Sequence, residues 1–335
     1  MNISYYPVLK WKKGEQDALK NLKVYQENFC PIIEIIEEHP PADFFAELKN
    51  CFCSTIYFDG SKIDYQLFYD YISYASLNNI PAYPILYPND LTNTMLTPPD
   101  KFSVRISIPV DFEGPSFEEI INLLSSSYQK QNINLILDAG EVTDSRIANL
   151  TFDSYNRIIS NNIDSLCEFG NIIICLTSFP EQLNIDAGED VAYKRYDILI
   201  YKKILKIFNN SKLHEKIQYS DYGVTKFTKS ETDFSKMRYS ILPKVKYTTK
   251  TQYIVKKGEK DRMQNIFTRS YIDISKEIVN SPYFFGKQFS YGDKCIYEKS
   301  HLPNATPGNP KQWVTYCANH HLTVLMEQLS NLSDF

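Results

Sequence analysis

Eight short apolar segments recur between residues 5 and 223, and most of them end in a polar or charged residue. Most are followed by a stretch with the residue spacing of an amphipathic helix. Regular alternation of strand and helix predicts an α/β fold of eight βα units, closed into an eight-stranded parallel (β/α)8 barrel of the TIM type with a polar mouth. The segments are residues 5–11, 30–36, 54–60, 81–87, 102–109, 133–140, 171–178 and 216–223.

The stretches between these segments support helices at most positions. Pro40 and Pro41 suit the first turn of a helix, because the N–H that proline lacks has no partner there in any case. Ser116 followed by Glu119 fits a capping box, in which each residue satisfies a backbone N–H of the other. Residues 191–210 have the pattern of a helix throughout.

The unit between the fourth and fifth segments is the weakest. Residues 88–101 are few and include Pro98 and Pro99, so we expect one or two helical turns there at most. An open, doubly wound sheet is the alternative topology. The sequence has no G-x-G-x-x-G after the first strand and no G-x-x-x-x-G-K-[ST], which are the usual phosphate-binding loops of that class, so the barrel is favoured.

The pattern changes after Gly223, which predicts a barrel over 1–223 and an appended subdomain over 224–309. Residues 238–261 alternate β-branched or aromatic residues with Lys and Thr, which indicates a β-hairpin with KKGEK at its turn. We expect a short helix, a stretch of loop and strand, a Pro/Gly/Asn loop, and a final helix that closes the barrel. These occupy residues 273–281, 284–300, 302–310 and 310–335.

The composition is that of a globular protein without an overall positive field. The net charge is −4, so neither nucleic acid nor an anionic membrane is an expected partner. The start of the chain has no apolar signal segment, and we expect a cytoplasmic protein. Cys51 and Cys53 lack a second Cys pair or a nearby His pair, so we expect no zinc site.

Several short motifs resemble the beta protein family of prophages and satellite phages. This chain has Tyr291 where the family's motif leads us to expect Trp, so an aromatic ring is kept. The resemblance covers essentially the whole chain and implies a component of a phage-defence or toxin-and-partner locus. The motifs are YYPVLKWKKGE at 5–15, SDYG at 220–223, FSYGD at 289–293, GNPKQW at 308–313 and NHHL at 319–322.

Polar residues at the carboxyl ends of the predicted strands are the candidate site. Such strand ends converge on one mouth of a parallel barrel, where barrel enzymes have their active sites. Carboxylates beside Lys and Arg could hold a divalent cation or a phosphorylated ligand, or act as general acid and base. The alternative is a buried ion-pair network with no ligand. The set is Lys10, Glu34, Asp59, Arg105, Asp138, Ser178 and Asp221.

The direction in which the Arg105 side chain points depends on strand register, because a shift of one residue would point it outward between the helices. Lys12, Lys13 and Gly14 follow the first strand and could bind a phosphate through charge and backbone N–H groups. The alternative for these lysines is that they are only solvated. No G-x-S-x-G motif or Ser-His-Asp order supports acyl transfer.

His320 and His321 are neighbours on the last predicted helix, and they point about 100° apart, so they cannot hold one metal ion together. His320 is a candidate catalytic residue if it reaches the mouth. A histidine near the core is otherwise a structural residue, with Asn319 or Asp293 as its hydrogen-bond partner.

Two functional hypotheses follow. The first is a cytoplasmic component of a prophage-encoded anti-phage defence or toxin-and-partner system that binds a ligand or a partner protein. Besides the resemblance, the basic segment 238–257 supports this hypothesis. It includes Lys244, Lys246 and Lys250 and has a strand edge able to receive another chain. The alternative is a barrel hydrolase that acts on a phosphorylated or nucleotide-like substrate at the polar mouth.

Overall fold

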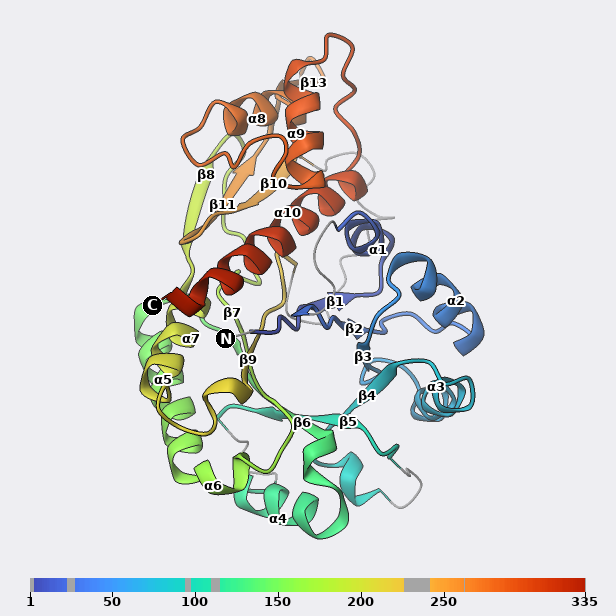
Figure 1. Cartoon of the computed structure of the whole chain (residues 1–335). Helices are drawn as coiled ribbons and strands as arrows, with labels where there is room; N and C mark the ends of the chain where they lie inside the picture. The colour runs from blue at the N-terminus through green and yellow to red at the C-terminus, as the bar shows by residue number, and fades with distance from the viewer. Residues whose placement is uncertain are drawn as a thin grey trace.

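The computed structural model describes residues 3–22, 28–93, 98–109, 115–225, 242–261 and 263–334. Eight parallel strands form one sheet in sequence order, with helices around it (Figure 1). The N–H of Tyr6 donates to the carbonyl oxygen of Tyr219 (2.8 Å) and that of Val8 donates to Asp221 (2.7 Å), so the last strand joins the first. The predicted (β/α)8 barrel is confirmed. Its strands are β1 (Val8–Lys10), β2 (Ile32–Glu34), β3 (Ile56–Asp59), β4 (Ala82–Leu86), β5 (Phe102–Ser107), β6 (Ile133–Glu141), β7 (Ile172–Thr177) and β9 (Ile217–Ser220).

Alternation along the strands divides the core into an inner and an outer part. Val8, Ile32 and Ile136 belong to a cluster that fills the barrel interior. Their neighbours Leu9 and Ile33 belong to the larger cluster that packs under the surrounding helices. Both faces of the strands are therefore apolar, which explains why these segments are continuous apolar runs rather than alternating ones.

The helices between the strands begin where the sequence indicates. The capping box of Ser116 and Glu119 is present at the start of α4. Between β4 and β5, Asp90–Thr92 forms a short 3-10 turn, and residues 94–97 lie outside the described part of the chain. The helices of the barrel are α1 (Lys13–Lys20), α2 (Pro41–Cys51), α3 (Tyr65–Leu77), α4 (Phe117–Ser127), α5 (Ser145–Asn161), α6 (Ile163–Leu166) and α7 (Tyr196–Ile207).

The prediction of one helix over 191–210 is wrong at its start. Asp190–Lys194 forms strand β8, the outer strand of a small antiparallel sheet with β11 (Gln252–Lys257) and β10 (Lys244–Thr248). Val191 pairs with Val255 and Tyr193 pairs with Tyr253. Pairing with a strand distant in sequence overrides local helical spacing here. The sheet thus combines a strand from within residues 1–223 with two later ones.

The hairpin between β10 and β11 exists, but its predicted turn is wrong. The chain reverses at Thr249, Lys250 and Thr251, and Lys256 and Lys257 remain in the strand. Lys256 stays there because its ammonium group lies between the carboxylates of Asp190 and Glu277. The KKGEK segment instead leads to a second hairpin of β12 (Glu259–Asp261) and β13 (Ile266–Arg269). Residues 238–241 of the predicted hairpin lie outside the described residues.

The prediction of loop and strand over 284–300 is wrong in its second half, which is helix α9 (Tyr291–His301). Ser290 caps this helix by accepting from the N–H of Asp293 (2.9 Å), so the FSYGD motif starts a helix. The short helix expected before it is present as α8 (Tyr271–Val279). Figure 1 places α8 and α9 beside the small sheet.

The last helix, α10 (Pro310–Ser330), connects the small sheet with the barrel. Thr315 donates to the carbonyl oxygen of Gly14 (2.9 Å), and Asn319 donates to that of Ala18 (3.0 Å), which holds α10 against α1. Leu325 and Leu329 are buried in the outer core of the barrel. Within the described residues, no helix has the length and apolar character needed to cross a membrane.

Candidate functional site

Arg105 of β5 lies at the centre of a buried group of charged side chains at the strand ends. Its Nη1 is 2.8 Å from Oδ2 of Asp59, and its Nε is 2.9 Å from Oδ2 of Asp138. The remaining Nη2 contacts the hydroxyl of Tyr222. Burial alone would lower the pKa of Arg105, but the Tyr222 and Asp138 oxygens raise it well above its ordinary value. Arg105 therefore points inward and remains charged.

The turns after the strands fix the two aspartates. Oδ1 of Asp59 accepts from the N–H of Ser61, and Oδ1 of Asp138 accepts from the N–H of Gly140, each at 2.9 Å. Gly140 has φ +64°, a left-handed conformation that glycine adopts without strain. The Asp-x-Gly sequence at this strand end thus holds its carboxylate toward Arg105.

Glu34 extends the group on the side of the first strands. Its Oε2 is 2.7 Å from Nζ of Lys62, and its Oε1 is 3.8 Å from Nη1 of Arg105. Tyr87 donates its hydroxyl hydrogen to Oδ2 of Asp59 (2.7 Å). We call Glu34, Asp59, Lys62, Tyr87, Arg105, Asp138 and Tyr222 the mouth network.

Glu15 and Lys10 lie beside this network. Glu15, like Lys62, Tyr87 and Tyr222, is not among the residues predicted from the sequence. Glu15 stands in the first turn of α1 and is 4% exposed. Burial raises its pKa to about 7. The charge of Lys10 and hydrogen bonds from the Lys10 backbone and the Thr225 side chain act against the shift, and Glu34 adds to it. Its Oε2 has no hydrogen-bond partner among the described residues. An acidic residue in the first turn of a helix usually complements the helix dipole at the surface, so nothing in the local sequence indicates that Glu15 is buried.

Lys10 is half-buried at the end of β1. Burial lowers its pKa, the nearby Lys62 lowers it further, and Glu34 and Glu15 oppose these effects. The pKa of Lys10 is thus shifted downward and that of Glu15 upward, and burial is the main cause of both shifts.

Asp221 does not join the mouth network. It accepts from the hydroxyl of Tyr5 (2.7 Å) and from the N–H of Gly223 (3.0 Å), and it is 3.1 Å from Nε2 of His321. Burial alone would raise its pKa, but His321 and Tyr5 keep it below the ordinary value. Alternation explains the difference, because Tyr222 points into the barrel and Asp221 therefore points outward, toward α10.

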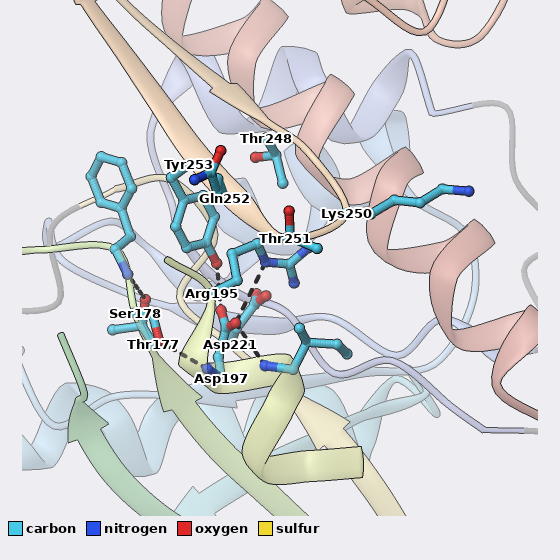
Figure 2. Close-up of polar contacts among 12 residues, drawn as sticks. Thr177, Ser178, Arg195, Asp197, Asp221, Thr248, Lys250, Thr251, Gln252 and Tyr253 are labelled. Carbon is cyan, nitrogen blue, oxygen red and sulfur yellow. Dashed lines mark hydrogen bonds and ion pairs between the residues drawn. The ribbon is translucent and has the colours of Figure 1, made fainter. Parts of the chain in front are cut away.

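His320 and Ser178 are also placed away from the mouth. The two ring nitrogens of His320 lie 2.7 Å from Oδ2 of Asp293 and 2.7 Å from the carbonyl oxygen of Thr248, and the ring stacks on Tyr247. Ser178 accepts from the N–H of Asp197 (2.8 Å), as Figure 2 shows. The structure gives both residues packing and hydrogen-bonding roles.

The segment after β1 is the start of α1, and phosphate binding by Lys12, Lys13 and Gly14 stays a prediction. Lys13 lies 3.6 Å from Asp17 and 3.7 Å from Glu47, as part of an exposed ion-pair group. A Cβ at Gly14 would lie 2.8 Å from a methyl carbon of Val314, so glycine allows α10 to approach α1 here. Close helix packing accounts for this glycine.

The residues that could hold a divalent cation have other partners. Within the described ranges, no three His, Cys, Asp or Glu side chains are grouped so that they could hold a metal ion. In the mouth network the carboxylates of Asp59 and Asp138 accept from Arg105, and Glu34 accepts from Lys62. Within the described residues, the carboxylates of the mouth network are thus paired with its cations.

The fold and the charged strand ends define a (β/α)8 barrel protein with an appended small sheet. A family model described as Beta protein matches residues 90–326, and the chain belongs to this family. No curated protein matches the chain. Among solved structures, the biosynthetic arginine decarboxylase SpeA from Campylobacter jejuni is similar with a TM-score of 0.39 and 10% identity. That match covers 98% of this chain and 56% of the decarboxylase chain.

Proposed function

We propose that the chain binds a small polar ligand at the mouth of the barrel and exchanges a proton with it through Glu15. The observation that carries this proposal is the buried Oε2 of Glu15, which has no hydrogen-bond partner among the described residues. A buried carboxyl oxygen without a partner costs stability. A ligand that offers a donor, or a water molecule to be activated, gives this oxygen a role.

The reaction that these groups suit best is hydrolysis of a phosphorylated or nucleotide-like ligand. Glu15, with a pKa of about 7, removes a proton from the attacking water. Lys10 and Lys62 lie near Glu34 and supply positive charge for an anionic ligand. Arg105 is a positioning residue, because its donors are engaged by Asp59, Asp138 and Tyr222.

The biological setting that we propose is a cytoplasmic, prophage-encoded defence or toxin-and-partner system. Membership of the Beta protein family supports it, through the resemblance of this family to components of such loci. In this setting a partner protein from the same locus is the second candidate ligand. The outer strand β8 favours it, because β8 pairs only with β11 among the described residues and so has one open edge.

Substitution of Glu15 by Gln tests the proposal. We expect purified native protein to be stabilised in thermal-shift assays by at least one member of a panel of nucleotides and sugar phosphates, and to release phosphate from it. The Glu15→Gln variant should lose phosphate release and remain folded. The exposed Glu118→Gln variant is the matched control and should behave as native protein. Phosphate release by Glu15→Gln at the native rate would contradict an acid–base role.

A further inference from the structure

A second cavity lies outside the barrel, between the start of α7, the turn from β10 to β11, and the C-terminal half of α10. Its volume is about 730 Å³, which is in the range of small-molecule sites. Figure 2 shows Arg195, Lys250, Thr251 and Gln252 from this region. The mouth network and Glu15 are not among its lining residues, so it is a separate site.

Arg195 lines this cavity and is fully buried. Its Nη1 donates to the carbonyl oxygen of Thr249 (3.2 Å) and to Oε1 of Gln328 (2.9 Å). Its Nε is 3.4 Å from Oδ1 of Asp197. Neither Nε nor Nη2 has a hydrogen-bond partner in the described part of the chain. A buried guanidinium with unused donors is costly unless an acceptor arrives from elsewhere.

Positive side chains surround the opening of the cavity. Lys194, Lys202 and Lys250 line it with Arg195, whereas Glu327 is the one carboxylate among the described lining residues. The chain as a whole carries a net charge of −4, so this concentration of positive charge is local. A cleft lined by one sign of charge raises the local concentration of ligands of the opposite sign.

An adjoining cavity of about 460 Å³ extends the positive surface along α7. It shares Lys194 and Lys202 with the first cavity and adds Lys203 and Lys206. Its described lining residues include no carboxylate. The two cavities share Lys194, Leu199 and Lys202, and we call them together the basic depression.

The walls of the larger cavity are partly apolar. Ile198, Leu199, Phe285 and Val324 contribute them. A bare inorganic ion would leave these side chains without a partner, whereas a ligand with an apolar ring system and anionic groups would contact both kinds of surface. Phe285 provides an aromatic ring for such a ligand.

We infer that this depression binds an organic phosphate of nucleotide size. The ring system lies in the larger cavity beside Phe285 and Val324. The ligand's phosphate oxygens accept from the ammonium groups of Lys194, Lys202 and Lys250, and the buried guanidinium of Arg195 adds positive charge beneath them. Further anionic groups lie toward Lys203 and Lys206 in the adjoining cavity.

Isothermal titration calorimetry with adenosine 5′-diphosphate, adenosine and inorganic pyrophosphate tests the inference. We expect the diphosphate to bind native protein, pyrophosphate to bind more weakly, and adenosine to bind weakest. The double variant Lys250→Glu/Lys206→Glu should lose roughly tenfold or more of the affinity for the diphosphate, because two positive side chains at the depression become negative. Charge reversal of the exposed Lys20 on α1 is the matched control and should leave affinity unchanged.

Arg195→Met should weaken diphosphate binding in protein whose circular dichroism matches the native spectrum, because it removes the positive charge beneath the cavity. If this buried substitution prevents folding, the double lysine variant decides the outcome, because both lysines are exposed. The Glu15→Gln variant should keep the native affinity, which separates this site from the mouth. Absence of diphosphate and pyrophosphate binding at millimolar concentrations, or equal affinity in the double variant, would overturn the inference.

Discussion

At the scale of single residues, Arg105 contributes most to the mouth network, because it compensates two buried carboxylates at once. Replacing Arg105 with Met removes the planar, forked guanidinium group and leaves Asp59 and Asp138 without their cation. We expect Arg105→Met to lower the free energy of unfolding by about 3–5 kcal/mol in urea denaturation, the usual cost of breaking a buried ion pair from one side.

Arg105→Lys is the matched control, because it keeps the charge and loses the planar fork. One ammonium group cannot reproduce the geometry of two bonds at 2.8 Å and 2.9 Å to different carboxylates, so we expect an intermediate loss. Equal stability of native protein and Arg105→Met would show that the carboxylates are not dependent on this residue.

Part of the mouth could be predicted residue by residue from strand ends, and part could not. Glu34, Asp59, Arg105 and Asp138 come together because each ends a strand or stands near its end. The other members of the mouth network and Glu15 come from the turns, strand ends and helix that follow, whose direction depends on tertiary packing. The prediction that Asp221 points into the mouth is wrong by one residue, because the next residue, Tyr222, points inward instead.

At the scale of elements, the packing of α9 on α10 depends on Gly292. A Cβ at this position would lie 2.2 Å from the carbonyl oxygen of Tyr316, which is a backbone atom that cannot rotate away. We expect Gly292→Ala to lower the free energy of unfolding by about 1–3 kcal/mol, the usual cost of overpacking. Lys294→Ala on the exposed side of α9 should change it by less than about 0.5 kcal/mol.

A fall in stability no larger for Gly292→Ala than for Lys294→Ala would mean that α9 shifts freely on α10. The glycine and aromatics of the FSYGD motif, which contains Gly292, locally predict loop and strand. The capping bond from Asp293 to Ser290 and the close contact with α10 account for the helix. Tertiary contacts override the local pattern in β8 as well, because its pairing with β11 replaces the helix that its residue spacing predicts.

At the scale of the whole molecule, the barrel was readable because its repeat is regular and both faces of each strand are buried. The way in which α10 and the small sheet are connected to the barrel was harder to predict from the sequence. It depends on contacts between residues about 300 positions apart, such as Thr315 with Gly14. The same contacts bring α10 and the β10 to β11 turn together around the basic cavity.

We propose that the mouth of the barrel holds an acid able to exchange a proton near neutrality. The pKa of Glu15 is raised from its ordinary 4.5 to about 7 in the folded chain. Between these values the unfolded chain loses the proton while the folded chain keeps it, so native stability falls as pH rises, by about 1.4 kcal/mol per pH unit. Glutamine stays uncharged throughout and avoids this loss.

The free energy of unfolding, measured from pH 4 to 8 for native protein and Glu15→Gln, tests this claim most directly. We expect the difference between the two proteins to shift in favour of the variant by about 3 kcal/mol as pH rises from about 4.5 to about 7, and then to level off. A difference that stays constant across this range would contradict the account, because it would place the pKa of Glu15 at the value of an ordinary surface carboxyl.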